Sequence, residues 1–371
     1  MAKREIDPRL QELFNEKKHV YSISKCNTID ECLYEAYNAY VLHERGSNGI
    51  YSILGSKVHD CLESVTNGEV SPSVLPSVLE EELNDLSMLG IDFPKDRNGG
   101  DSIRNSWVAD MKHFCENFVP LEGKFDTEEL FIYQLNEDRY VQGYIDLIRH
   151  NDDGTISILD WKTSSAFSKE DLLHHGRQLI LYAIAKEAEG FKVRDVAWYM
   201  LKYCEVSFMG KKRANSKELS LITKVVNRGK LVSELKNNIE YHLSATGYDE
   251  IDIECMLNQA LEENSLSCLP ADIQSKYKIE PHIRQYEITD ELKVECIQYI
   301  NSMADKWESL DTSSAANFPP RSFTKKTKQG KEVDSSYFCQ VLCNYRNTCK
   351  YLKMYKEMQN NEPEDEFSDL F

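Results

Sequence analysis

The segment from Gly143 to Tyr182 constrains this chain most, because it places charged residues inside predicted strands. It contains Gly-Tyr-Ile-Asp-Leu-Ile, then Ile-Leu-Asp-Trp-Lys-Thr-Ser, and then Gln-Leu-Ile-Leu-Tyr. In a strand, Asp160 and Lys162 point to the same face as the apolar Ile158. An acid and an amine on an apolar face are costly to bury unless they pair or bind a metal. A salt bridge at a hairpin edge and a metal site are therefore the two interpretations.

The surrounding residues favour the metal site. Asp146 precedes a polar turn at the distance that lets it face Asp160 across a hairpin. Gln178 and Tyr182 lie at positions i and i+4 of the next predicted helix and form one polar stripe directed at the sheet. His59 lies on an otherwise apolar helix, where a lone histidine is more often structural than a ligand.

These residue types suit one kind of chemistry. Carboxylate oxygens are ligands for Mg²⁺ and Mn²⁺, and an imidazole beside them favours Mn²⁺ as well. Such an ion lowers the pKa of a bound water and neutralises charge in a phosphoryl transition state. Lys162 would orient that water or stabilise the developing negative charge. The set is typical of sites that cleave phosphodiester bonds.

Composition sets wider limits. A chain of 371 residues can form one large domain or two. No apolar run approaches the roughly 20 residues that span a bilayer, and the N-terminus has no secretory pattern. We therefore expect a cytoplasmic protein without membrane contact, in which the eleven cysteines form no disulfide framework. The net charge of −18 does not suggest a nucleic-acid binder, but a local basic groove would suffice for one.

Periodicity and turn signals predict an α/β core in which a β-meander is followed by a crossover helix and another strand. The expected strands cover 127–135, 139–149, 155–163, 193–208 and 279–289, and the expected helices cover 27–43, 52–67, 78–88, 103–118, 169–189 and 290–310. Residues 209–280 are expected to be a mostly helical insertion.

The motifs resemble those of the PD-(D/E)xK nuclease superfamily, in the branch typified by the RecB nuclease domain and the CRISPR-associated adaptation nucleases. The matching elements, in the expected order, are Gly55-Ser-Lys-Val-His59, Gly143-Tyr-Ile-Asp146, Ile158-Leu-Asp160-Trp-Lys162-Thr-Ser and Gln178-x-x-x-Tyr182. The resemblance implies a restriction-endonuclease-like core, a mixed central sheet flanked by helices, with helical N-terminal and inserted segments and a C-terminal cysteine-rich element.

The resemblance also implies roles for individual residues. The metal ligands would be His59, Asp146, Asp160 and the backbone carbonyl of Trp161. Lys162 would be the catalytic lysine, and Gln178 and Tyr182 would support the site and the DNA. The expected parts are a helical N-terminal part with the histidine (1–125), the nuclease core (126–208), the insertion (209–280), a C-terminal strand, helix and cysteine cluster (281–359) and an acidic disordered tail (360–371).

Three C-terminal cysteines, Cys339, Cys343 and Cys349, lie close together in a chain expected to be reduced. Such spacing suggests binding of a soft metal. The same nuclease branch includes members with a [4Fe–4S] cluster held by one N-terminal and three C-terminal cysteines. Cys32 is the better N-terminal candidate and Cys26 the second. Zinc in the same thiolates, or thiols that only pack a helix, are the alternatives.

Basic residues just before these cysteines are candidate DNA contacts: Arg321, Lys325, Lys326, Lys328 and Lys331. The plainer interpretation is a solvated loop. Lys211, Lys212 and Arg213 are weaker candidates.

The expected function is that of a metal-dependent deoxyribonuclease with Mg²⁺ or Mn²⁺, most of all an exonuclease that processes DNA ends in recombination, repair or phage DNA metabolism. Its DNA would be single-stranded or have free ends, and a separate helicase or recombination protein would be its partner. The alternatives are a structure-specific endonuclease, an RNA nuclease, and a non-catalytic DNA-binding protein on a nuclease fold. A phage or mobile element is the expected source.

Overall fold

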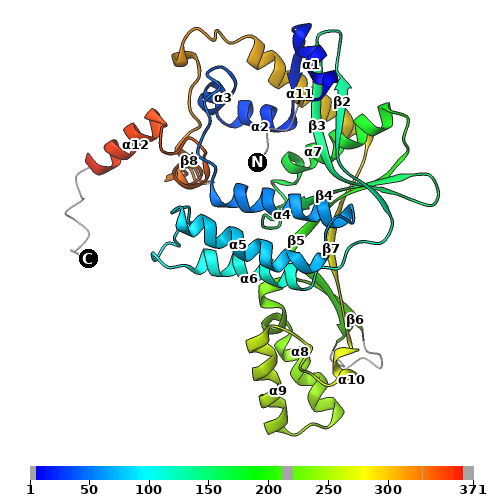
Figure 1. Cartoon of the computed structure of the whole chain (residues 1–371). Coiled ribbons are helices and arrows are strands. Elements are labelled where there is room, and N and C mark those ends of the chain that lie inside the picture. The colour runs from blue at the N-terminus through cyan, green and yellow to red at the C-terminus, as the bar shows by residue number, and fades with distance from the viewer. Residues whose placement is uncertain (1–5, 211–219, 328, 362–371) are drawn as a thin grey trace. The chain divides into compact units, whose positions relative to one another are not determined.

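The computed structural model describes residues 6–210, 220–327 and 329–361, and Figure 1 shows the chain. The chain divides into two compact units. The core unit comprises residues 54–131 and 144–293, and the terminal unit comprises residues 1–53, 132–143 and 294–371. None of the helices in the described ranges is long and apolar enough to cross a membrane.

The described residues form a seven-stranded mixed sheet in the order β1-β3-β4-β5-β6, in which β2 also pairs with β3 and β7 with β5. Strand β3 (Arg139–His150) runs antiparallel to β4 (Ile156–Lys162). Helix α7 (Leu172–Ala188) then returns the chain, so that β5 (Val193–Met209) runs parallel to β4. Parallel neighbours need such a crossover, usually a helix. The predicted mixed sheet flanked by helices is confirmed.

Strand β4 and helix α7 form the interior of the core unit. Residues 156–161 of β4 are all buried, and so are residues 179–186 of α7. A helix that is apolar all round belongs inside a protein, which explains why α7 lacks a solvent face over this stretch. Helices α4 (Ile50–Thr66), α5 (Leu75–Met88) and α6 (Ser102–Glu116) supply further layers, and α5 packs on α6 (Figure 1).

The segment predicted as a mostly helical insertion contains three helices and also a strand that was not predicted. Strand β6 (Leu221–Asn227) pairs with the far half of β5, and β7 (Tyr277–Tyr286) pairs with β5 as well. Residues 221–227 are rich in β-branched side chains, which suit a strand. Helices α8 (Leu231–Thr246), α9 (Glu250–Glu263) and α10 (Ala271–Gln274) cover this extension and share a hydrophobic cluster with it. The predicted basic residues 211–213 lie outside the described residues.

The helix predicted over residues 27–43 is also corrected. Two helices, α2 (Ile23–Glu31) and α3 (Leu33–Tyr40), are separated at Cys32, whose backbone is extended (φ −154°). The periodicity continues across the break, so the sequence pattern missed it. The terminal unit further contains α1 (Pro8–Asn15), β1 (His19–Tyr21), most of α11 (Asp290–Glu308), the hairpin of β8 (Thr324–Lys326) and β9 (Glu332–Asp334), a π-helical turn (Phe338–Leu342) and α12 (Lys350–Asn361).

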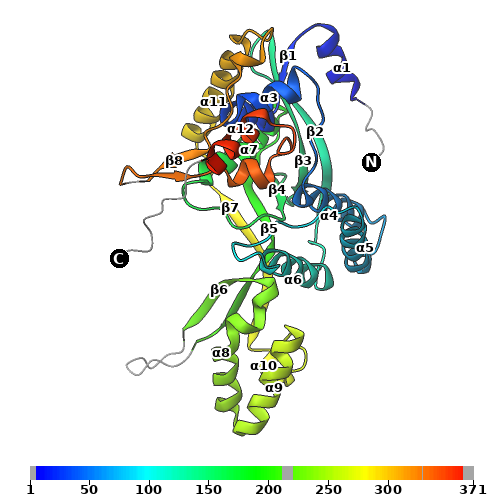
Figure 2. The same cartoon turned by 90° about the vertical axis from the view of Figure 1, so that its left-hand side faces the viewer.

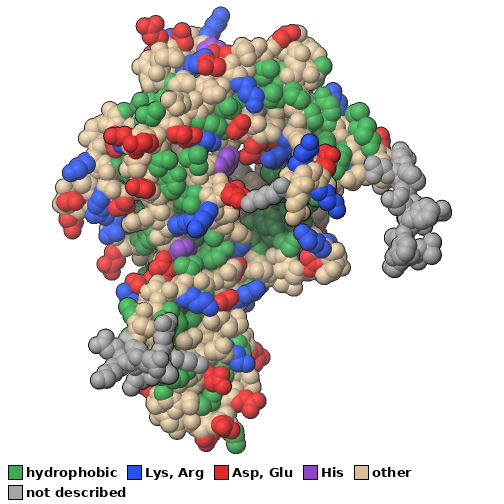
Figure 3. Space-filling view, turned by 180° about the vertical axis from the view of Figure 1, so that it is seen from behind, with side chains coloured by type: hydrophobic (Ala, Val, Ile, Leu, Met, Phe, Trp, Pro, Cys, Tyr) green, Lys and Arg blue, Asp and Glu red, His purple; other side chains and the backbone are tan. Residues whose placement is uncertain are grey.

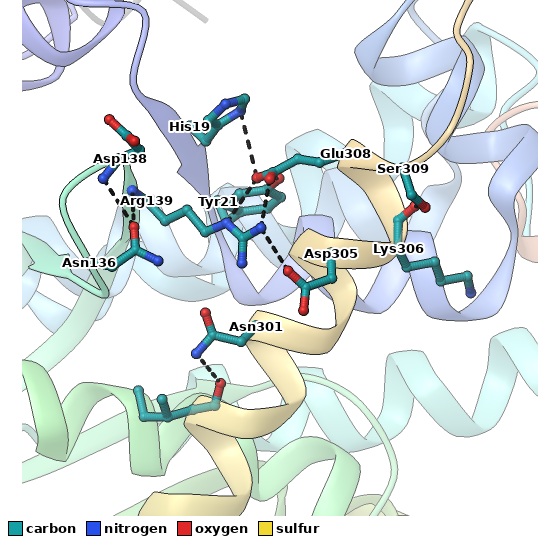
Figure 4. Close-up of polar contacts among 11 residues, drawn as sticks. His19, Tyr21, Asn136, Asp138, Arg139, Asn301, Asp305, Lys306, Glu308 and Ser309 are labelled. Carbon is teal, nitrogen blue, oxygen red and sulfur yellow. Dashed lines mark hydrogen bonds and ion pairs between the residues drawn. The ribbon is translucent and has the colours of Figure 1, made fainter.

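An ion-pair network ties β3 to α11 within the terminal unit, as Figure 4 shows. Arg139 makes a two-pronged contact with Glu308, with distances of 3.1 Å from Nε to Oε1 and 2.6 Å from Nη2 to Oε2. It also lies 2.7 Å from Asp305, and the Tyr21 hydroxyl donates to Glu308 at 2.8 Å. Such paired geometry adds direction to the contact, so the network fixes the position of α11 on the strand.

Gly176 allows α7 to approach β7 closely. A Cβ atom at this position would lie 2.2 Å from Cζ of Tyr286. We expect Gly176→Ala to lower the free energy of unfolding by about 1–3 kcal/mol, because the ring has to move. Thermal and urea unfolding measure this, with Gly49→Ala, which meets open space, as the matched control. In a Tyr286→Ala background the same substitution should have little effect. Equal stability of Gly176→Ala and the wild type would contradict the close packing.

Candidate active site

Asp146 and Asp160 lie at the point where two central strands stop pairing. The ladder between β3 and β4 runs from His150↔Ile156 to Leu147↔Leu159, so the next opposed pair would be these two aspartates. The backbone N–H of Trp161 donates to the Asp146 carboxylate at 2.9 Å. A side chain therefore satisfies a strand N–H, which lets both carboxylates stay together at the end of the ladder.

Helix α4 brings His59 to the same place. Its Nδ1 lies 3.6 Å from Oδ2 of Asp146, and its ring meets the Trp161 ring edge to face at 5.8 Å between centroids. Gly55 lies one turn earlier on α4. Any side chain there would contact Thr163 tightly, since a Cβ would lie 3.3 Å from its Oγ1. Burial lowers the pKa of His59, while the Asp160 carboxylate and a hydrogen bond to the Trp161 backbone act in the opposite direction.

A chain of polar contacts leads from Asp160 to helix α7. The Lys162 ammonium lies 2.6 Å from Oδ2 of Asp160 and donates to Oε1 of Gln178 at 3.1 Å. The Gln178 amide donates in turn to the Tyr182 hydroxyl at 2.6 Å. The ammonium thus has a fixed position between the strand and the helix. The structure brings His59, Asp146, Asp160, Lys162, Gln178 and Tyr182 together in one unit.

The electrostatics of this group are those of crowded buried acids. Desolvation and the charge of Asp160 raise the pKa of Asp146 well above its usual range. Burial raises the pKa of Tyr182 well above normal, with both aspartates adding to the effect. Asp160 is 1% exposed, and its Oδ2 lies in an ion pair 2.6 Å from the Lys162 ammonium, without the angles of a hydrogen bond. A cation at this place would relieve all three groups.

The donor set fits a divalent ion, although its members currently engage each other. Two carboxylates and an imidazole supply the oxygen and nitrogen ligands that Mg²⁺ and Mn²⁺ accept, and the buried Oδ2 of Asp160 would exchange the Lys162 ammonium for the ion. Across residues 6–210, 220–327 and 329–361, no three His, Cys, Asp or Glu side chains already have the spacing of a metal site. Binding would therefore require His59 and Lys162 to yield their present contacts with the carboxylates.

A family model of the PD-(D/E)XK nuclease superfamily matches residues 20–350 of the 371. The chain belongs to the PD-(D/E)XK nuclease superfamily. Membership implies a nuclease, an enzyme that cleaves phosphodiester bonds, and it implies DNA as the substrate. Nucleases of this superfamily generally use Mg²⁺ or Mn²⁺.

Other comparisons add little to this assignment. No curated protein matches the chain. Six chains of solved structures match, among them the crystal structure of SSO0001, which is 13% identical. That match covers 70% of this chain and 85% of the other, with a TM-score of 0.22, and a likeness at this level carries no argument.

The four predicted cysteines of this PD-(D/E)XK protein line one pocket of the terminal unit, together with Glu35, Arg321 and aromatic side chains. Burial raises the pKa of Cys32, and hydrogen bonds from the backbone N–H groups of Glu35 and Arg321 offset part of this increase. Burial raises the pKa of Cys339 to about 11 and that of Cys343 to about 12. The N–H of Tyr345 donates to the Cys343 sulfur at 3.4 Å. Cys32, at the break between α2 and α3, thus lines the same pocket as the three C-terminal cysteines.

The predicted DNA contacts fall into two groups. Lys325 and Lys326 are exposed on β8, in the orange hairpin at the left of Figure 2. Arg321 instead faces inward, 3.3 Å from Glu31 and over the Phe338 ring. Lys328 lies outside the described residues. On the face in Figure 3, Lys and Arg side chains are interspersed with Asp and Glu side chains.

Two residues near the site escaped the sequence analysis. His175 precedes Gln178 by one helical turn and stacks on Phe167 at 3.9 Å. Burial, the neighbouring His174 and the Lys162 ammonium lower the pKa of His175 to about 4, so it is neutral at pH 7. Its spacing from Gln178 was the signal that would have found it. Glu128 of β2 (Lys124–Gln134) is the other, and strand alternation gives no hint of its position.

Replacing Asp146 by Asn should stabilise the metal-free protein. The raised pKa means that ionisation of Asp146 opposes folding. This penalty is absent below the pKa of the unfolded chain, grows as the pH rises, and is complete above the folded-state pKa. Asn has no charge and keeps an oxygen for the Trp161 N–H. We expect a gain in the free energy of unfolding on the order of 1–2 kcal/mol at pH 7 in EDTA, vanishing toward pH 3.

Urea unfolding at both pH values measures this gain. Asp152→Asn, at an exposed turn position, is the control and should change little. A less stable Asp146→Asn protein at pH 7 would show that the carboxylate is well accommodated without a cation.

Proposed function

We propose that this nuclease is a metal-dependent DNA exonuclease that processes DNA ends in recombination, repair or phage DNA metabolism. The opposed Asp146 and Asp160 at the end of the β3–β4 ladder, with Lys162 held beside them, are the observation that supports it. The RecB-like branch of the superfamily, with the CRISPR-adaptation nucleases, is the proposed relationship.

Each side chain has a proposed role. His59, Asp146, Asp160 and the Trp161 carbonyl would hold Mg²⁺ or Mn²⁺, which supplies a water of lowered pKa and neutralises charge on the phosphate. Lys162 keeps its proton at Nζ and directs it at the oxygen that gains negative charge. Gln178 accepts from that ammonium and is itself oriented by Tyr182. Tight packing of β4 and α7 keeps these positions fixed.

Cleavage of end-labelled DNA tests the proposal directly. The substrates are linear single-stranded, linear duplex and covalently closed circular DNA, each with Mg²⁺, Mn²⁺ or EDTA. We expect loss of linear DNA only, dependent on the metal, and a decrease of about 10²-fold or more in Asp160→Ala and Lys162→Ala. Asp152→Ala is the matched control. Full activity in either site variant would remove the site from the mechanism.

The same experiment separates the rival functions. Cutting of closed circles would make the protein an endonuclease, and cleavage of a labelled RNA would make it an RNA nuclease. Binding of DNA without cleavage under any condition would make it a non-catalytic DNA-binding protein. A cytoplasmic location and a separate helicase or recombination partner are part of the proposal, and so is contact of Lys325, Lys326 and Lys328 with DNA phosphates.

We also propose a [4Fe–4S] cluster in the cysteine pocket, held by Cys32, Cys339, Cys343 and Cys349. A cluster takes one thiolate per iron atom, so its ligands stand farther apart than those of a single ion. Backbone N–H groups that point at ligand sulfurs, as at Cys32 and Cys343, are a feature that tunes such clusters. The group would link the two ends of the terminal unit and act structurally.

Iron and acid-labile sulfide in protein purified without oxygen test the cluster. We expect about four of each per chain in the wild type, and a loss of both with lower stability in Cys343→Ser. Cys255→Ser, an exposed thiol on α9, should keep the full content. If the protein instead contains one zinc per chain, the pocket is a zinc site. If the wild type contains no metal and is no more stable than Cys343→Ser, the thiols only pack the terminal unit.

A further inference from the structure

Strand β4 ends at Lys162, but its neighbour β5 continues past this point. The β4–β5 ladder closes with the pair Lys162↔Met200, and the chain then forms the post-lysine loop, residues 163–168. Residues 164–166 and 168 of this loop are exposed, so burial of their side chains does not hold it. A loop of this kind keeps one conformation only where other elements bind it.

Two consecutive residues of β5 bind the middle of the post-lysine loop. The Tyr203 hydroxyl accepts from the backbone N–H of Ala166 at 3.1 Å, and the Lys202 ammonium donates to Oγ of Ser165 at 3.5 Å. In a regular strand, consecutive side chains point to opposite faces. The register of the β5–β7 ladder shifts over residues 199–204, and irregularities of this kind re-aim side chains. Both side chains of this stretch therefore reach the same loop.

Strand β7 binds the far end of the loop. The Arg284 guanidinium donates from Nη1 to the carbonyl of Phe167 at 3.0 Å. The Phe167 ring stacks on His175 of α7 at 3.9 Å between centroids, and it meets the Trp198 ring edge to face at 5.0 Å. Arg284 and Trp198 oppose each other in the β5–β7 ladder, so both side chains approach Phe167 from one face of the sheet.

These contacts affect both supports of the Lys162 ammonium. The ammonium lies between Asp160 of β4 and Gln178 of α7, so its position depends on how α7 lies against the strand. The post-lysine loop connects β4 to α7, and Phe167 packs on His175, one helical turn before Gln178. Contacts that fix the loop therefore also fix the place of the ammonium.

We propose that Tyr203 and Arg284 are positioning residues for Lys162, and that they act by holding the post-lysine loop. The inference deepens the proposed function and rests on the role of the Lys162 ammonium at the phosphate. Neither side chain has to touch DNA or the cation. Because a displacement of about 1 Å at a catalytic group can cost on the order of 10²-fold in rate, a single hydrogen bond to the loop can influence the reaction.

Initial rates of cleavage test the assignment, measured with Mn²⁺ over a range of concentrations of the DNA that the wild type cleaves. Tyr203→Phe removes only the hydroxyl that accepts from Ala166. We expect kcat to fall about 10-fold at unchanged KM, because the ammonium is displaced while the DNA contacts remain. Tyr277→Phe is the matched control. It loses a buried hydrogen bond to His242 in the same unit and should keep the wild-type kcat.

A conservative variant separates the hydrogen bond from packing. Arg284→Met removes the donor to Phe167 and should also lower kcat about 10-fold, whereas Arg284→Lys keeps a donor and should recover most of the rate. Hydrogen exchange of the intact protein gives a second measurement. We expect faster exchange of the 163–168 amides in Tyr203→Phe and Arg284→Met, with exchange in α8 as in the wild type.

The outcomes distinguish this inference from the proposed function. If Tyr203→Phe and Arg284→Met cleave at the wild-type rate while Lys162→Ala does not, the catalytic site stands and the two residues do not position it. A higher KM at unchanged kcat would make the loop a DNA contact, which also overturns the inference. If the wild type cleaves no DNA, or if Lys162→Ala keeps full activity, the proposed function fails and the inference fails with it.

Discussion

The repulsion between two buried carboxylates is the constraint on which the rest of this site depends. Asp146 and Asp160 face each other where β3 and β4 stop pairing, and at low dielectric such neighbours cannot both ionise without compensation. The compensation in the structure is partial: one backbone N–H for Asp146 and one ammonium for Asp160. His59 lies against the Asp146 carboxylate. Gln178, itself bonded to Tyr182, holds the Lys162 ammonium in place. Under the proposed function, this remaining negative charge and the rigid walls prepare the site for a cation rather than for a salt bridge alone.

Packing, not polar contact, gives that site its rigidity. Strand β4 is buried along both faces before Lys162, and α7 is buried all round where Tyr182 lies. Two glycines set the distances at which helices approach: Gly55 brings α4 to Thr163, and Gly176 brings α7 to Tyr286. Close-packed protein interiors resist small displacements of their side chains. The core therefore carries the cost of keeping like charges together, and part of its stability offsets the repulsion that the chemistry needs.

The sequence predicted the centre of this arrangement better than its edges. The β3–β4 hairpin and α7 followed from strong periodicity, so the contacts of Asp146, Asp160, Lys162, Gln178 and Tyr182 could be anticipated. Periodicity could not reveal the break at Cys32, because both sides of it are helical. Strand β6 was missed because its partner, the end of β5, is supplied by tertiary structure. Arg321 faces inward because it contacts Glu31 and Phe338, and the local sequence pattern does not reveal these contacts. The left-handed backbone of Glu128 departs from the regular alternation of a strand, so periodicity could not predict it either.

The overall charge of −18 fits a nuclease once the cation is considered. Without an ion, the carboxylates at the end of the β3–β4 ladder repel a phosphate, and the exposed lysines of β8 are too few to reverse the sign of the whole chain. With a divalent ion bound, the same oxygens carry a positive centre that attracts phosphate. Binding of the ion and of DNA would then be coupled, and by linkage each strengthens the other. Under the proposed function, an acidic protein gains its affinity for DNA at the one place where the bond is cut.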